Sequence, residues 1–153
     1  RGSVLTSEME LFMELTPARV IGITGSDGKT TTTTLTGLFL EEECKRRGRG
    51  RVHVGGNIGK PLLPWVEAMQ ADDFAVVELS SFQLMKMSHA PNIAIVTNVS
   101  PNHLDWHKGM EEYIFAKSNK KIIQKQIAII LGSDYSHHPF RTQRSQKSSR
   151  FTL

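Results

Sequence analysis

The chain has 153 residues, of which 39% are hydrophobic, and a formal net charge of +4. This length allows one domain with a core of its own. No apolar run approaches the roughly 20 residues that a membrane-spanning helix needs, and the first residues lack the apolar segment of a secretion signal. The single cysteine, Cys44, excludes an internal disulfide and suits a reducing compartment. We therefore expect a cytoplasmic protein without a membrane span.

The excess positive charge comes from one end of the chain. Residues 136–153 contain four basic residues and no acidic one, and the remainder has as many basic as acidic side chains. Because this segment lacks apolar periodicity, we expect a disordered basic tail. A second basic cluster, residues 45–51, is interpreted as a solvated helix end that stops at Gly48. The neutral body argues against a nucleic-acid partner, although salt-sensitive binding through the tail stays open as an alternative.

Helices and strands are predicted to alternate along the chain. In the first helix, residues 6–15, Ser7 can act as the N-cap and Glu10 stands at the capping-box position. Met9, Phe12 and Met13 share one face of that helix. Further helices are expected at 30–45, 61–70 and 109–126, and strands at 19–24, 51–55, 73–80, 92–99 and 127–132.

This alternation predicts an α/β fold, a three-layer sandwich with a mostly parallel sheet and right-handed crossovers. In such sheets ligands bind beyond the carboxyl ends of the strands. The polar segments GSDGKT, GGN, ELSSFQ and TNVSPNHLD all fall at or just after predicted strand ends. We therefore expect them to gather on one rim of the sheet.

The segment VIGITGSDGKTT, residues 20–31, predicts a phosphate site. A buried strand leads into a glycine turn, and a lysine and threonines open the next helix. Backbone N–H groups, a helix N-terminus and a cation are what a phosphate needs. The standard P-loop spacing would place glycine where Ile23 stands, which argues against a generic P-loop ATPase. A plain glycine-rich turn is the alternative. The residues assigned to the site are Gly25, Ser26, Asp27, Gly28, Lys29, Thr30 and Thr31.

Two further groups of side chains stand near the predicted rim. Glu78 ends a buried strand, where a carboxylate must be paired, hydrated or bound to a metal; beside a triphosphate it favours a Mg²⁺ ligand over a salt-bridge partner. His103 and His107 have a spacing known from zinc sites, but no second pair supports zinc. For His103, a structural and a functional role remain equally open. By its pattern alone, Lys117 is a surface lysine.

The order of these motifs resembles one family. GITGSDGKTTTTTL, GGNIGKPL, VVELSSFQL and TNVSPNHLDWH, followed by a helix that contains AK, are similar to the central ATPase domain of the Mur ligases. The resemblance covers about residues 5–134. It implies a P-loop NTPase-like fold, with residues 1–18 as an interdomain connection and leading helix, 19–135 as a partial central domain, and 136–153 as the tail.

The resemblance also implies a reaction, the ATP-dependent joining of an acid to an amino acid in peptidoglycan precursor synthesis. GGNIG and ELSSFQL are most similar to the members that add D-glutamate to UDP-MurNAc-L-alanine through an acyl phosphate. ATP and two Mg²⁺ ions are the implied cofactors, and the implied enzyme is a monomer of the bacterial cytoplasm. The protein contributes mainly positioning and charge neutralisation.

Residue roles follow from the same resemblance. It implies that Thr30 and Glu78 bind the Mg²⁺ beside the triphosphate, and that His103 and Lys117 support the second ion, Lys117 after carbamylation. Lys29, His103 and Lys117 are the implied catalytic residues. The implied contacts to the muramoyl substrate are Asn57, Ser81 and Gln83.

Some positions depart from the family pattern. Asp27 stands where asparagine is common, Asn102 stands where an aspartate often precedes the histidine, and Lys120 and Lys121 compete with Lys117 for the modified position. The family's uridine-nucleotide-binding and closing domains have no counterpart in this sequence, so we expect this chain alone not to catalyse ligation. A sister Mur ligase, a folylpolyglutamate synthase and a truncated ATP-binding remnant are the alternatives.

Overall fold

The structure is a computed structural model that describes residues 6–57, 59–98 and, for the backbone alone, 127–130. Its sheet has five parallel strands in the order β2-β3-β1-β4-β5. The predicted strands are all present. Their bounds are β1 (Arg19–Thr24), β2 (Val52–Gly56), β3 (Phe74–Glu78), β4 (Ile93–Val96) and β5 (Ile127–Ile130).

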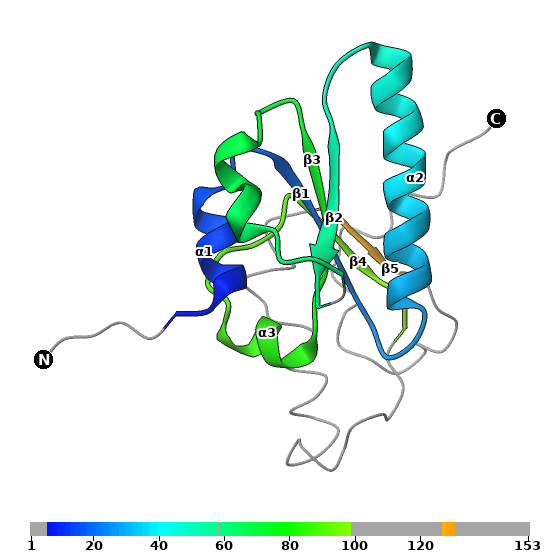
Figure 1. The fold of residues 1–153 in the computed structure, drawn as a ribbon. Helices are drawn as coiled ribbons and strands as arrows, with labels where there is room; N and C mark the ends of the chain where they lie inside the picture. The colour runs from blue at the N-terminus through cyan, green and yellow to red at the C-terminus, as the bar shows by residue number, and fades with distance from the viewer. Residues whose placement is uncertain (1–5, 58, 99–126, 131–153) are drawn as a thin grey trace, which may run out of the picture.

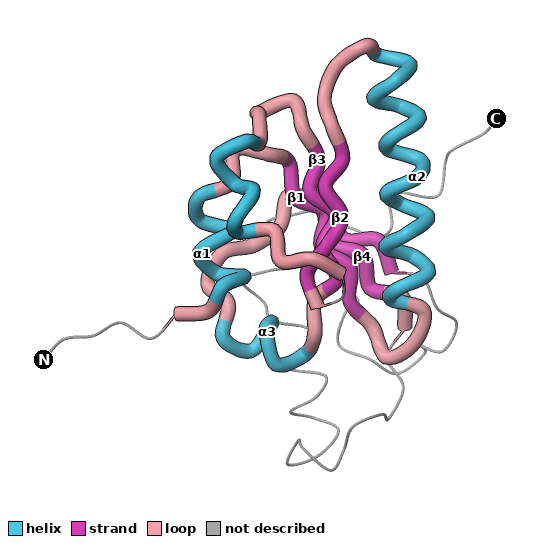
Figure 2. The backbone as a smooth tube through the Cα atoms, in the orientation of Figure 1, coloured by secondary structure: helices cyan, strands magenta, loops and turns pink. Residues whose placement is uncertain are grey.

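Helices cover both faces of this sheet, which confirms the predicted α/β layers (Figure 1). Helix α2 (Lys29–Arg47) lies on one side, and α1 (Glu8–Leu15) and α3 (Ser81–Lys86) lie on the other (Figures 1 and 2). Among the described residues, the helices are too short or too polar to cross a bilayer.

The core consists of two apolar clusters, one for each face of the sheet. The cluster of Val20, Ala75 and Val77 includes Phe12 of α1, and the cluster of Ile21, Ile23 and Val76 includes Cys44 of α2. Strand β3 is buried along its whole length. A central parallel strand is covered on both faces, so it reads as a continuous apolar run.

The register of the sheet places the carboxyl ends of four strands, β1 to β4, at one edge. Ile23 of β1 lies opposite Glu78 of β3, and Gly56 of β2 lies opposite the same glutamate. On the other side of β1, Thr24 lies opposite Val96 of β4. The loops that follow these strands therefore start from one edge, as the sequence predicted.

Helix α2 explains the threonine run at its start. Thr30 and Thr34 are exposed, whereas Thr33 is fully buried against the sheet. The Thr34 hydroxyl donates to the Thr30 carbonyl at 2.9 Å. The helix ends at Gly48, whose φ of +67° is the left-handed conformation of a helix stop. The predicted end of this helix is thus confirmed.

The basic residues at the end of α2 form ion pairs within the same helix. Arg46 and Arg47 donate to the carboxylate of Glu43 at 2.6–2.8 Å. These hydrogen bonds lower the pKa of Glu43 to about 2. The interpretation of this cluster as a solvated helix end therefore holds.

Two local predictions need correction. The helix expected at 61–70 is a shorter 3₁₀ helix, η1 (Leu63–Ala68), because Pro64 lies at its start and Met69 turns to extended backbone to bury its side chain. The ELSSFQ segment, residues 78–83, contains the last residue of β3 and the start of α3, a helix that was not predicted from the sequence. Ser80 caps this helix and forms a capping box with Gln83.

Glu10 also differs from its predicted role. The Ser7 hydroxyl accepts from the Glu10 N–H at 3.2 Å, as an N-cap should. The Glu10 carboxylate instead accepts hydrogen bonds from the backbone and side chains of Ser88 and His89, including His89 Nδ1 at 2.7 Å. It therefore ties α1 to the segment before β4.

The Thr33 hydroxyl is a buried polar group without a hydrogen-bond partner in the described part of the chain. Thr33→Val keeps the side-chain shape and removes this group, so we expect the free energy of unfolding to rise by about 1 kcal/mol. Urea unfolding at neutral pH measures it. Thr34→Val, at an exposed position, is the control and should shift the value by less than about 0.5 kcal/mol. A destabilised Thr33→Val variant would contradict the assignment.

The Glu10 carboxylate predicts an acid-sensitive contact. Burial raises its pKa, but hydrogen bonds from Ser88 and His89 outweigh this and leave the pKa below the ordinary value. Its stabilising contribution is therefore present above the ordinary carboxyl pKa of about 4.3 and is lost as the pH falls through the lowered folded value. Glu10→Gln should lower the free energy of unfolding at pH 7. Below about pH 4.5, the free energy of unfolding of the variant should change less with pH than that of the parent. Urea unfolding across pH 3–7 tests this, and equal slopes for both proteins would contradict it.

Candidate phosphate and magnesium site

The loop between β1 and α2 turns on two glycines. Gly25 has φ +152° and Gly28 has φ +75°, conformations that side chains disfavour. A Cβ at Gly25 would lie 1.8 Å from Thr97 Oγ1, whereas a Cβ at Gly28 would meet nothing within 4 Å. Gly25 is thus required for close packing against β4, and Gly28 for backbone conformation alone.

Lys29 lies folded over this loop. Its Nζ donates to the carbonyl oxygens of Gly25 and Ser26, each at 2.9 Å. The ammonium group is therefore placed inside the turn, at the start of α2. A ligand phosphate that entered the turn would meet this charge directly.

The amino terminus of α2 adds donors to the same place. Gly28 is the N-cap and provides no side-chain hydrogen bond to the helix. The first N–H groups of a helix have no partner within it, and the helix dipole favours an anion there. Thr30 and Thr31 are exposed in this first turn. The predicted phosphate-binding residues are thus brought together in one loop and helix start.

The predicted Mg²⁺ ligands lie side by side. Glu78 is only 2% exposed, and its Oε2 accepts from Thr30 Oγ1 at 3.0 Å. Its Oε1 lies 3.5 Å from Asn57 Nδ2, and its carbonyl oxygen accepts from Asn57 N at 2.9 Å. A carboxylate and a hydroxyl next to a phosphate loop suit Mg²⁺, which binds few protein oxygens and takes others from phosphates and water. The donor set therefore fits this ion.

The residues predicted to contact the second substrate spread along the same rim. Asn57 follows β2, and Ser81 is buried at the first residue of α3. The side-chain oxygen of Gln83, Oε1, accepts from Ser80 N at 2.8 Å, so it serves the capping box. Gln83 also lines a cavity of about 250 Å³ with Ser7, Glu8, Met9, Gly56, Pro61 and Leu62. Their contact to a substrate stays a prediction.

Two other predicted site residues, His103 and Lys117, lie outside the described residues, as does the predicted helix at 109–126. Within residues 6–57, 59–98 and 127–130, no group of three histidine, cysteine or acidic side chains could hold a metal ion. A dedicated protein cage for zinc thus has no support in this part of the chain.

Sequence reasoning missed Thr97 and Asn98. Asn98 Oδ1 accepts from Ser26 N at 3.0 Å and Asp27 N at 2.8 Å, and Thr97 Oγ1 donates to the Asp27 carbonyl at 2.6 Å. The available signal was their position, because they directly follow a buried strand predicted to end on the phosphate rim.

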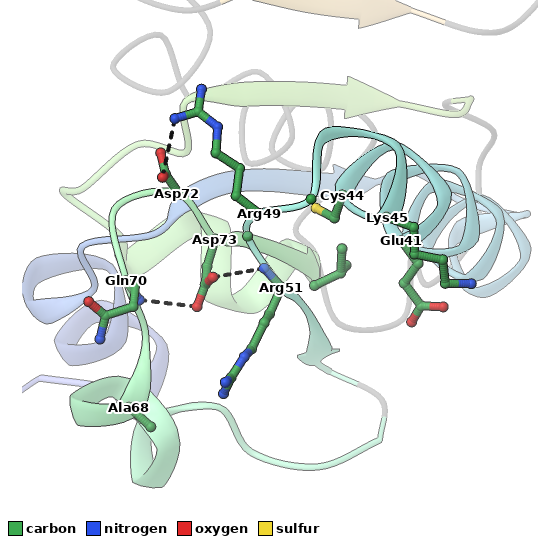
Figure 3. Close-up of a pocket in the computed structure, with 12 residues that line it drawn as sticks. Glu41, Cys44, Lys45, Arg49, Arg51, Ala68, Gln70, Asp72 and Asp73 are labelled. Carbon is green, nitrogen blue, oxygen red and sulfur yellow. Dashed lines mark hydrogen bonds and ion pairs between the residues drawn. The ribbon is translucent and has the colours of Figure 1, made fainter.

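A second cavity lies at the opposite edge of the sheet. It measures about 810 Å³ and is lined by residues that precede β2 and β3, among them Arg49, Arg51, Asp72 and Asp73. Figure 3 shows Asp73 accepting from the backbone N–H groups of Arg51 and Gln70, at 2.8 and 3.1 Å. Burial raises the pKa of Asp73, but these bonds and one from His53 leave it lowered. Asp73 thus joins two loops, far from the phosphate turn.

The sequence of this chain is similar to those of known proteins. The sequence model of the Mur ligase middle domain matches residues 23–153. UDP-N-acetylmuramoylalanine–D-glutamate ligases from Clostridium botulinum (strain Okra / Type B1) and Clostridium kluyveri (strain ATCC 8527) are 58% and 56% identical over 118 and 119 residues. These matches cover 77% and 78% of this chain and 25% of each relative. The chain therefore spans about a quarter of the length of these relatives.

The two glycines of the turn predict different costs of substitution. Gly28→Ala strains the backbone only, which costs about 1 kcal/mol of unfolding free energy. Gly25→Ala adds a collision with Thr97 and should cost more than about 3 kcal/mol. Denaturant unfolding of the two variants measures the difference. Equal losses would show that Gly25 is not packed as described.

Proposed function

This chain belongs to the Mur ligase middle-domain family, and we propose that it forms the ATP-binding part of a ligase that adds D-glutamate to UDP-MurNAc-L-alanine. The proposal of D-glutamate as the amino acid rests on the names and identity of the clostridial relatives. The GGNIG and ELSSFQL segments support the same choice among related ligases.

The observation that carries the proposal is the hydrogen bond between Thr30 Oγ1 and Glu78 Oε2 at 3.0 Å. It places a buried carboxylate at the mouth of the turn that contains Lys29. Burying a carboxylate is costly unless it is paired or binds a metal. A Mg²⁺ ion held by Thr30 and Glu78 would neutralise charge on the β- and γ-phosphates of ATP.

The chain's own residues would then position the nucleotide. The N–H groups at the start of α2 donate to phosphate oxygens, and the Lys29 ammonium, freed from the Gly25 and Ser26 carbonyls, stabilises charge on the γ-phosphate. The substrate carboxylate attacks the γ-phosphorus and ADP leaves, which gives an acyl phosphate. The D-glutamate amine then attacks the acyl carbon, inorganic phosphate leaves, and the nitrogen loses a proton. The protein supplies orientation and charge rather than a covalent step.

The remaining roles belong to the proposal by family resemblance. We assign His103 and a carbamylated Lys117 to a second Mg²⁺, and Asn57, Ser81 and Gln83 to the muramoyl substrate. The position of Asn57 beside Glu78 supports its placement near the phosphates. By the same resemblance we propose a monomeric enzyme of the bacterial cytoplasm, and the buried free thiol of Cys44 suits that compartment.

Nucleotide binding by this chain is tested by calorimetric titration of ATP with and without Mg²⁺. We expect Mg²⁺-dependent binding that Lys29→Ala weakens at least about tenfold, because a charge-assisted bond contributes roughly 1.5–3 kcal/mol. Glu78→Gln should reduce the gain in affinity that Mg²⁺ provides. Lys45→Ala, at the far end of α2, is the matched control and should bind as the parent does. Binding that is indifferent to Mg²⁺ and Lys29 would refute the proposed site.

The ability of this chain to support ligation is tested in a chimera. The matching 118-residue segment of the Clostridium botulinum relative is replaced by that of this chain. We expect phosphate release that requires both UDP-MurNAc-L-alanine and D-glutamate, and Lys29→Ala in the chimera should abolish it. A folded chimera that releases no phosphate would contradict the proposal.

A further inference from the structure

Two polar residues, Thr97 and Asn98, directly follow strand β4 and contact the turn between β1 and α2 from the side. The Asn98 side-chain oxygen accepts from Ser26 N at 3.0 Å and Asp27 N at 2.8 Å. The Thr97 hydroxyl donates to the Asp27 carbonyl at 2.6 Å and lies 3.3 Å from the Thr24 carbonyl. These contacts join positions about 70 residues apart in the sequence.

The contacts continue the pairing of β1 and β4 beyond the sheet. The strand ladder ends at Thr24 opposite Val96, and Thr97 N donates to the Thr24 carbonyl at 2.9 Å. Past that point the Ser26 N–H lies 3.0 Å from both the backbone carbonyl oxygen and the Oδ1 of Asn98, and the side chains of Thr97 and Asn98 add the contacts to Asp27. The absence of a Cβ at Gly25 is what admits the Thr97 hydroxyl so close to the turn.

Lys29 and Asn98 hold opposite sides of the same short segment. Lys29 Nζ binds the carbonyl oxygens of Gly25 and Ser26, while Asn98 binds N–H groups of Ser26 and Asp27. If Lys29 binds a phosphate, its hydrogen bonds to these two carbonyl oxygens break. The contacts from β4 would then be what keeps the turn open in the bound state.

We propose, on the basis of the proposed nucleotide-binding function, that Thr97 and Asn98 are positioning residues that keep the turn in its phosphate-accepting shape. They orient the first half of the turn, Gly25 to Asp27, so that the N–H groups of the second half, at the start of α2, face the phosphates. Neither residue needs to contact the nucleotide. Their effect on binding passes through the backbone of the turn.

The chain contains a matched control for this role. Asn92, at the other end of β4, uses its Oδ1 to accept from Val20 N of β1 at 2.6 Å. It makes the same kind of bond between the same two strands, but at the edge away from the phosphate turn. A purely structural role predicts that Asn92→Ala and Asn98→Ala behave alike.

The test is calorimetric titration of Mg²⁺-ATP and of Mg²⁺-tripolyphosphate into the parent chain and the two asparagine variants, with urea unfolding of each. We expect Asn98→Ala to lose about tenfold in affinity for both ligands, because the Asp27 N–H loses its acceptor and the Ser26 N–H keeps only the Asn98 backbone carbonyl. Asn92→Ala should lose stability and keep the parent affinity. Equal affinity for the parent and Asn98→Ala, or equal losses for the two variants, would overturn the inference.

A second pair of variants guards against misfolding of Asn98→Ala. Thr97→Ser keeps the hydroxyl and should bind within about twofold of the parent, while Thr97→Val keeps the shape and should lose about tenfold. If the parent itself binds neither ligand, the proposed nucleotide-binding function fails. Amide hydrogen exchange tests the contacts of Asn98 without a ligand: fast exchange at Ser26 and Asp27 in the parent would refute those contacts, and slow exchange in the parent that becomes fast in Asn98→Ala would support them.

Discussion

The register of β1 between β3 and β4 is the constraint on which the site depends. It sets Ile23 opposite Glu78 on one side and Thr24 opposite Val96 on the other. The turn after β1 therefore starts between an acid and a pair of polar residues from two other strands. A slip of one residue would send the Glu78 side chain to the other face of the sheet, and the contact to Thr30 would be lost.

The phosphate turn is held by neighbours rather than by its own residues. Thr97 and Asn98 bind its backbone from β4, Lys29 binds its carbonyl groups from α2, and Glu78 binds the first threonine from β3. Gly25 allows this crowding because it has no Cβ. A loop that three elements hold in place is pre-organised, so it loses little conformational entropy when a ligand binds.

The threonines at the start of α2 make contacts that offset their low helix propensity. Threonine is a poor helix former because its branched side chain is restricted against the preceding turn. Here Thr30 reaches Glu78, Thr33 packs against the sheet and Thr34 bonds back to the helix. The helix packs on the sheet through Cys44 and the partly buried Leu40, and it ends at Gly48.

Sequence alone determined the five strands, helices α1 and α2, and the order of the loop chemistry. Apolar runs such as FAVV ended at turn residues, and the order glycine, lysine, threonine after a strand indicated a phosphate site, because these signals lie within a few neighbouring residues. Tertiary structure alone decided that Glu10 binds Ser88 and His89 instead of closing its own cap, and that Thr97 and Asn98 hold the turn. Those partners lie about 70 to 79 residues apart. No local pattern contains such a pairing, because it arises only when parallel strands bring distant residues to one edge.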